Sequence, residues 1–313
     1  MNGERFRGVI PALICPFRPD LEIDEAELAR FSTWLARQPG IVALMTNGHT
    51  GEVFSLTLPE RNRVTRIVAD AVGHIVPVVS AIVCEGIRDA VDAAKQARDA
   101  GAAALDIMPP HHCLRFGFRP HQVIEYFSAI GEACGLPLLA HIYPAWTKGS
   151  YSSATLAELA RLPCVAGFKI GTREMSKYAY DIRAIRGANP EVAVLNCHDE
   201  YLLASSVQGV DGGLLGFASL IPGLIHEVFE GVRTGDLKRA QAAQARIDPL
   251  KDAVYGGGEP TGEAHARMKT AMMMAGLIKS DLVRPPTEAP NAAERAQIAA
   301  ALEQAGFEVR AAA

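Results

Sequence analysis

The sequence predicts an α/β fold, a (β/α)8 or TIM barrel, followed by a C-terminal helical extension. Short apolar runs alternate with amphipathic stretches, and eight such pairs are complete by about residue 233. The apolar runs are almost continuously hydrophobic, as expected of parallel strands that are covered on both faces. Eight strand–helix pairs in this length also fit the usual size of such a barrel, roughly 250 residues.

The elements follow one another in a regular order. GVIPALI is the first strand, and Asp24 and Glu27 after it have the spacing of a helix capping box. IVALM then precedes a helix that begins at Pro59 and ends at Gly73. The predicted strands are 8–14, 41–45, 75–80, 102–108, 136–142, 164–170, 191–196 and 211–217. The helices after the last six strands are expected at 86–100, 120–133, 153–161, 173–186, 199–206 and 221–233.

After residue 233 the strands stop and only helical stretches follow. These stretches cover 236–252, 263–276 and 291–305, and the loop-like segments GGGEP and RPPTEAPN join them. We therefore expect a barrel over residues 1–233 and a helical appendage over 234–313. A doubly wound open sheet is the alternative architecture, but no GxGxxG motif follows the first strand.

The composition excludes several classes of partner. The 313 residues are 49% hydrophobic and 21% charged, with a net charge of −4, and they lack the clustered Lys and Arg that bind nucleic acid or anionic membranes. No uncharged apolar run approaches the ~18 residues of a membrane span, and the first residues do not resemble a signal peptide. The six cysteines include no CxxC pair, which favours reduced thiols and a cytoplasmic location.

Polar side chains gather where the predicted strands end. Active sites of this fold lie at the C-terminal ends of the strands, and those ends carry most of the nine histidines. The turn from Gly48 to Gly51 follows the second strand, and its backbone N–H groups could bind an anion, with the Thr50 hydroxyl completing a carboxylate clamp. An ordinary glycine-rich turn is the alternative.

Lys169 is the sharpest single signal, because it lies inside the apolar sixth strand, CVAGFKI. Burial disfavours the charged form of a lysine and lowers its pKa. A partly neutral amine can attack a carbonyl carbon and form a Schiff base. The alternatives are a lysine that reaches from the strand end to solvent, or one that pairs with a carboxylate.

Together, these motifs resemble the dihydrodipicolinate synthase / N-acetylneuraminate lyase family of class I, Schiff-base-forming aldolases. The family's G-T-T-G-E turn is similar to residues 48–52, its G-I/F-K-x strand to 167–170 and its P-Y-Y segment to 110–112. Its Y-x-x-P motif is similar to residues 141–144, and its strand-eight G-x-x-G-x-x-x-x-x-A-N pattern is similar to residues 209–219. The resemblance extends from about residue 5 to about residue 305.

The resemblance implies a mechanism and an assembly. Lys169 would bond covalently to C2 of a 2-oxo acid, either pyruvate or a substrate that releases pyruvate, without a metal or a dissociable cofactor. Gly48, Thr50 and Gly51 would hold the carboxylate of that acid, and the Leu214 carbonyl would lie near the imine. The family is usually a homotetramer, a dimer of dimers.

The sequence departs from the family at the proton relay. Histidine stands at all three relay positions: His49 for a threonine, His141 for the strand-five tyrosine, and His112 for the tyrosine that crosses from a neighbouring subunit. The arginine that binds a distal carboxylate has no clear counterpart in the loop 146–148. We therefore expect a divergent member of the family rather than a true dihydrodipicolinate synthase.

The three histidines allow several interpretations. They could form an acid–base relay with His141 closest to Lys169, they could bind a larger substrate, or they could hold a zinc-like metal ion. They could also lie apart from one another. The expected activity is an aldolase, and dehydration of a 2-oxo-3-deoxy sugar acid through the same lysine imine is the alternative. A metal-dependent hydrolase would require the metal-binding interpretation. A sensor without chemistry is the non-enzyme alternative. His198 or Asp199 could also contact the substrate, whereas His265 is expected on the surface of the appendage.

Overall fold

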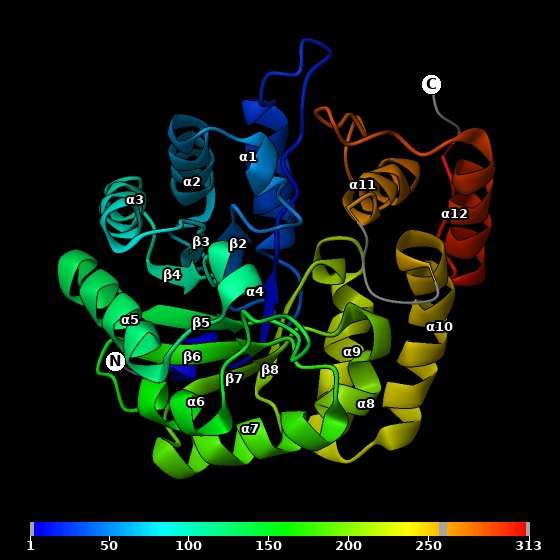
Figure 1. Cartoon of the computed structure of the whole chain (residues 1–313). Helices are drawn as coiled ribbons and strands as arrows, with labels where there is room; N and C mark the ends of the chain where they lie inside the picture. The colour runs from blue at the N-terminus through cyan, green and yellow to red at the C-terminus, as the bar shows by residue number, and fades with distance from the viewer. Residues whose placement is uncertain (1–2, 257–261, 311–313) are drawn as a thin grey trace.

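The computed structural model describes residues 3–256 and 262–310. Within them, eight parallel strands form a barrel that helices cover on the outside (Figure 1). Hydrogen-bonded neighbours follow the order β1-β8-β7-β6-β5-β4-β3-β2, and parallel bridges from Val9 to Ile41 and from Ala12 to Met45 close the ring. The strands are β1 Val9–Pro11, β2 Leu44–Thr46, β3 Val78–Ile82, β4 Ala104–Ile107, β5 Leu138–Ile142, β6 Val165–Ile170, β7 Ala193–Asn196 and β8 Gly212–Leu215. The predicted fold class is confirmed.

The outer helices begin where the local sequence predicts. The Asp24 side chain accepts a hydrogen bond from the N–H of Glu27 at 3.0 Å, a cap that stabilises a helix by about 1 kcal/mol. Thr57 and Glu60 form a reciprocal capping box at the next helix. The helices are α1 Glu25–Leu35, α2 Leu58–Val72, α3 Ile87–Asp99, α4 His112–Phe116, α5 Pro120–Cys134, α6 Ser153–Ala160, α7 Met175–Ala188, α8 Leu202–Ser206 and α9 Pro222–Thr234. The sequence did not predict α4.

The alternation of side chains on the strands determines which residues face the barrel interior. Phe168 and Ile170 of β6 pack in the cluster between the sheet and the helices, so Lys169 between them points inward. Ala140 and Ile142 of β5 belong to the same outer cluster, so His141 points inward as well. The interior is otherwise filled by small and aliphatic side chains such as Ala104, Leu139, Ala193, Leu195 and Leu214.

The helices after the barrel share its hydrophobic core. They are α10 Leu237–Tyr255, α11 Ala264–Met274 and α12 Ala292–Gln304, close to the three stretches predicted. One cluster joins Phe31 of α1 to Ile247, Met272 and Ile298 of these helices. The predicted loop GGGEP lies outside the described residues except for Gly256, and the division of the chain at residue 233 stays a prediction.

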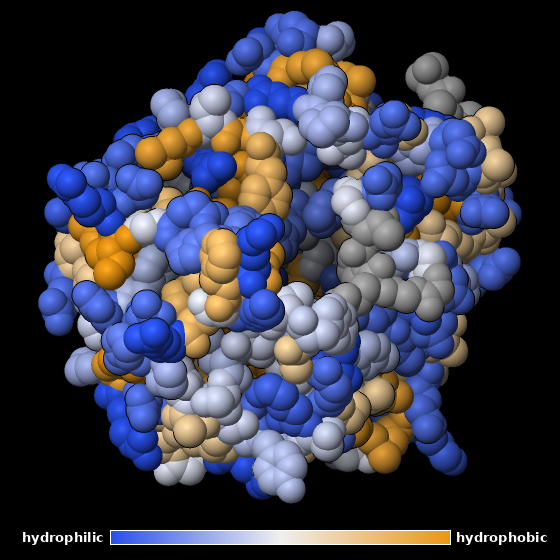
Figure 2. All heavy atoms as spheres, viewed as in Figure 1, coloured by the Kyte–Doolittle hydropathy of each residue, from blue (hydrophilic) through white to orange (hydrophobic). Residues whose placement is uncertain are grey.

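On the face that Figure 2 shows, the apolar areas are scattered rather than continuous. Figure 2 shows hydrophobic residues in separate patches among hydrophilic ones on the face in view. Among the described residues, no helix combines the length and hydrophobicity needed to cross a membrane. The six cysteines are all free thiols.

Candidate active site

A cavity of about 390 Å³ lies at the C-terminal ends of the strands and contains Lys169. His49, Thr50 and Leu214, which the sequence singled out, line the same cavity. A larger hollow of about 600 Å³ lies on the outer surface between α1, α9 and α10. We assign the chemistry to the smaller cavity, because it is the one that meets the strand ends, where barrels of this type carry their active sites.

Lys169 is buried next to His141. The strand register pairs Lys169 with His141 of β5 and with Leu195 of β7, and the lysine is only 7% exposed. Within the described part of the chain, no ion pair involves its ammonium group. The alternatives to a reactive amine were a solvated lysine and a lysine paired with a carboxylate. The structure favours neither of them.

His141 is held by a carboxylate that sequence reasoning missed. Its Nδ1 lies 3.1 Å from Oδ2 of Asp106, an interior residue of β4, and both side chains are buried. Burial and the nearby Lys169 lower the pKa of His141, although Asp106 acts in the opposite direction. A neutral ring that donates from Nδ1 to Asp106 leaves Nε2 as a proton acceptor. The pair thus holds a proton acceptor in a fixed position beside the lysine.

A tyrosine hydroxyl joins this group from an unexpected position. Tyr143 OH lies 3.2 Å from Nε2 of His49, and the His49 and His141 ring centroids are 6.0 Å apart. Burial raises the pKa of Tyr143, so its hydroxyl stays protonated. Burial, with His141 and Lys169 nearby, lowers the pKa of His49 well below its usual range. Two neutral imidazoles and one hydroxyl therefore lie near Lys169.

His112 does not join this cluster within one chain. It begins α4, its side chain is 50% exposed, and its Nδ1 lies 2.9 Å from Oε2 of Glu85. The described residues contain no group of three or more side chains that could hold a metal ion. The interpretation of His49, His112 and His141 as one metal site is therefore wrong for this chain, because Glu85 holds His112 at the surface.

The turn after β2 has the compact form expected of an anion-binding loop. The N–H of Gly51 donates to the Gly48 carbonyl at 3.0 Å, and that of Glu52 donates to the His49 carbonyl at 2.9 Å. Within the described residues, no backbone bond uses the N–H of His49 or Thr50. Gly51 is tightly enclosed, because a Cβ there would lie 3.0 Å from the Leu13 carbonyl oxygen and that backbone would have to shift. Carboxylate binding by this turn stays a prediction.

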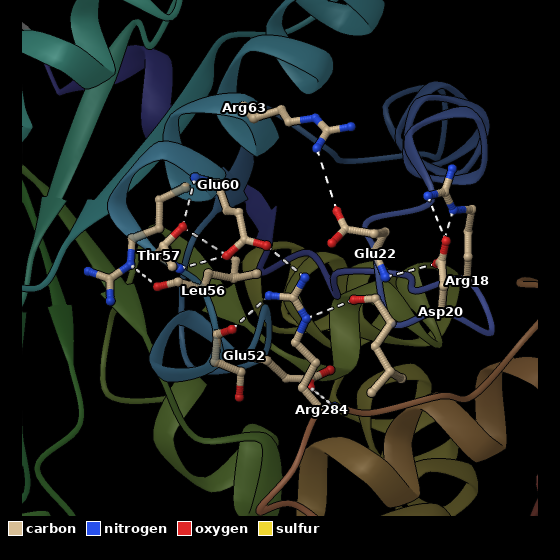
Figure 3. Close-up of polar contacts among 12 residues, drawn as sticks. Arg18, Asp20, Glu22, Glu52, Leu56, Thr57, Glu60, Arg63 and Arg284 are labelled. Carbon is tan, nitrogen blue, oxygen red and sulfur yellow. Dashed lines mark hydrogen bonds and ion pairs between the residues drawn. The ribbon is translucent and has the colours of Figure 1, made fainter.

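The C-terminal region fixes this turn from outside the barrel. Lys269 of α11 is fully buried in an ion pair with Glu52, which has a left-handed backbone with φ of 54°. The Lys269 ammonium also donates to the Leu282 carbonyl at 2.8 Å. Figure 3 shows Arg284 reaching the same region, where it donates to Glu60 at 2.7 Å and to the Ser55 carbonyl at 2.9 Å.

Lys269→Met should lower the free energy of unfolding by about 3–5 kcal/mol, because it leaves the Glu52 carboxylate buried without its cation. Lys279→Met is the matched control, since Lys279 pairs with Glu27 at 3.5 Å but is 70% exposed; its expected loss is below about 1 kcal/mol. Urea unfolding of both variants measures the difference. A Lys269→Met protein as stable as the control would contradict this account.

Two further residues line the cavity: Asp199, a possible substrate contact from the sequence, and His265, which the sequence placed elsewhere. Asp199 is buried and accepts hydrogen bonds from the Tyr255 hydroxyl at 2.7 Å and from the N–H groups of Gly216 and Phe217 at 3.2 Å; burial raises its pKa to about 6. His265 of α11 also lines the cavity, so its predicted position on the surface is wrong. His198 is buried against Tyr201 instead, with ring centroids 4.6 Å apart.

The fold and the site define a barrel enzyme with a buried lysine at the end of its sixth strand. Comparison with protein families then gives the particular group: the model of the dihydrodipicolinate synthetase family matches residues 5–305. The chain belongs to this family and is one of its lyases. The expected extent of the resemblance is confirmed.

The similarity to individual relatives is moderate and covers nearly the whole chain. A 4-hydroxy-tetrahydrodipicolinate synthase of Hyphomonas neptunium is 32% identical, over 96% of this chain and 99% of its own. An N-acetylneuraminate lyase of Escherichia coli is 27% identical, over 90% of both chains. The structure of dihydrodipicolinate synthase from Aquifex aeolicus has a TM-score of 0.87 at 20% identity, covering 98% of this chain and 100% of that one. The chain is thus a divergent member of the family.

Proposed function

We propose that this protein is a Schiff-base-forming lyase that acts through Lys169 on a 2-oxo acid, either pyruvate or a substrate that releases pyruvate. The observation that carries the proposal is the position of Lys169. It lies inside a strand-end cavity, next to a histidine–carboxylate pair and without a carboxylate partner among the described residues. Such a site suits attack of an amine on a carbonyl carbon.

The residues around Lys169 suggest how the reaction proceeds. The amine adds to C2 of the 2-oxo acid and water leaves, so that a protonated imine forms. Removal of a C3 proton then gives an enamine, and we assign this step to Nε2 of His141, which Asp106 holds in place. The enamine forms a carbon–carbon bond with an aldehyde, and hydrolysis of the imine releases the product. Cleavage is the same sequence in reverse.

The other predicted site residues bind the substrate in this scheme. The substrate carboxylate would accept hydrogen bonds from the free N–H groups of His49 and Thr50 and from the Thr50 hydroxyl. Gly48 and Gly51 would give the turn its shape, and the Leu214 carbonyl would face the imine from the cavity wall. Tyr143 and His49 would pass protons between the cavity and the substrate.

Dehydration of a 2-oxo-3-deoxy sugar acid is a second candidate, favoured by the Asp106–His141 pair. A fixed histidine base could remove a C3 proton from the imine while hydroxide leaves from C4. Mass analysis of the products separates the two activities, because the lyase yields pyruvate and an aldehyde, whereas the dehydratase yields water and a dioxo acid. A protein that produces neither from any 2-oxo acid would contradict the proposal.

Condensation of pyruvate with aspartate semialdehyde should be slow or absent. The loop that follows β5 supplies no cation to the cavity, since Lys148 instead donates to the Arg115 carbonyl at 2.8 Å. A distal carboxylate therefore has no partner there. Steady-state kinetics measure the rate, and a kcat/KM of about 10⁴ M⁻¹s⁻¹ or more, in the range of efficient enzymes, would show that the chain is an ordinary dihydrodipicolinate synthase.

Assembly bears on the role of His112. The family resemblance predicts a homotetramer in which this residue enters a neighbouring site. Two large apolar side chains near α4 are compatible with an interface, since Phe116 is 73% and Trp146 is 56% exposed. The homotetramer and the cytoplasmic location stay predictions.

A further inference from the structure

His265 reaches the active-site cavity from α11, outside the strand–helix repeat. It lies one helical turn before Lys269, so the two side chains share one face of the helix. Lys269 is fully buried against Glu52, and Met268 beside it is also fully buried. A Cβ placed on Gly216 would lie 3.3 Å from both Met268 Cε and Asp199 Oδ2. This face of α11 is therefore fixed against the cavity, and it presents the His265 ring there.

The His265 ring is available to a ligand. No hydrogen bond or ion pair joins its nitrogens to any described residue, whereas His141 and His112 each have a carboxylate partner. Burial, with Lys269 and Lys169 nearby, lowers the pKa of His265 to about 4. The ring is thus neutral near neutral pH, and it offers one hydrogen-bond donor and one acceptor to the cavity.

The charges around the cavity exclude a second acidic group on the substrate. Three cations near the site are already paired, Lys269 with Glu52, Arg173 with Glu200 and Arg284 with Glu60. Among the described residues that line the cavity, Lys169 carries the one lysine or arginine cation, and the protonated imine would hold that charge beside C2 rather than at the far end of the substrate. Asp199 adds a carboxylate to the wall. An anionic group at the far end would therefore be desolvated without a cation, which is costly.

We propose that His265 is a specificity-determining residue that hydrogen-bonds the half of the substrate beyond C3, and that this half is uncharged and carries a hydroxyl group. The proposal rests on the Schiff-base lyase function above. Ser55 and Thr287, two residues with hydroxyl side chains, line the same cavity, which suits a hydroxylated aldehyde. A substrate without this hydroxyl would leave the buried His265 ring without a hydrogen-bond partner, which costs binding free energy. The hydrogen bond therefore selects the hydroxylated substrate.

The test compares three aldehydes in condensation with pyruvate: glyceraldehyde, propionaldehyde and succinic semialdehyde. The wild type should prefer glyceraldehyde, which is uncharged and hydroxylated. His265→Leu should lower kcat/KM for glyceraldehyde about tenfold, mainly through KM, which corresponds to the loss of one hydrogen bond of about 1.4 kcal/mol. The same variant should leave kcat/KM for propionaldehyde unchanged. His265→Gln, which keeps a polar side chain, should retain much of the wild-type preference for glyceraldehyde. His74→Leu, at an exposed histidine before β3, is the matched control.

Borohydride trapping of pyruvate runs in parallel on every variant. Unchanged trapping in His265→Leu shows that the variant is folded and that its imine forms. Three outcomes would overturn this inference but leave the lyase function intact. In the first, His265→Leu traps pyruvate and keeps the wild-type preference among the aldehydes. In the others, the wild type prefers succinic semialdehyde, or it traps pyruvate but does not condense it with glyceraldehyde. A wild type that traps no 2-oxo acid would overturn the lyase function, and this inference with it.

Discussion

Lys169→Ala should slow deuterium exchange at C3 of pyruvate by about 10⁴-fold or more, because no enamine forms without the amine that makes the imine. This exchange, followed by NMR in D₂O, reports enamine formation whatever the partner aldehyde is. Lys169→Arg should be equally inactive, since it keeps the positive charge but makes no imine. Lys148→Ala is the control, because Lys148 is an exposed lysine outside the cavity.

The two Lys169 variants separate covalent catalysis from electrostatics. If Lys169→Arg kept substantial exchange activity, the lysine would act as a charge and not as a nucleophile. Both variants should remain folded, because the Lys169 ammonium has no ion-pair partner among the described residues that its removal would leave unpaired. Loss of activity can therefore be assigned to the chemistry.

His141→Phe should lower the same exchange rate by about 10²-fold, the contribution of one positioned base, while borohydride still traps pyruvate on Lys169. The lowered pKa of His141 keeps the ring neutral as the pH falls, so the wild-type rate should decline only below that lowered pKa. Asp106→Asn should also slow exchange. It removes the group that raises this pKa, so the acid limb of the rate profile should move to lower pH.

The pH profile distinguishes a positioning role for Asp106 from a purely structural one. A merely destabilised Asp106→Asn protein would lose activity without a shift of the acid limb. Near-full exchange in His141→Phe would show that another group, such as His49, removes the C3 proton.

The sequence predicts the barrel well, because each strand–helix pair carries its own signals. Asp24 and Thr57 cap their helices through local bonds, and such bonds are visible in a short stretch of sequence. The strands are shorter than their apolar runs. Leu13 and Ile14, for example, are buried beyond the end of β1. The five-residue helix α4 shows no periodicity long enough to detect.

The site could be predicted only in part. Lys169, Thr50 and Leu214 lie at strand ends, where the fold itself indicates a site. Asp106 had the same signal as Lys169, a charge inside an apolar strand, and could have been found by it. His265 could not, because its place in the cavity depends on how α11 packs against the turn after β2, through contacts such as Lys269–Glu52.

The most direct test of the account is to incubate the protein with pyruvate, reduce with borohydride and measure the intact mass. The wild type should gain the mass of one reduced pyruvate per chain, located to Lys169 by peptide mapping, and Lys169→Ala should gain none. Trapping that persists in Lys169→Ala, or a wild type that traps no member of a panel of 2-oxo acids, would contradict it.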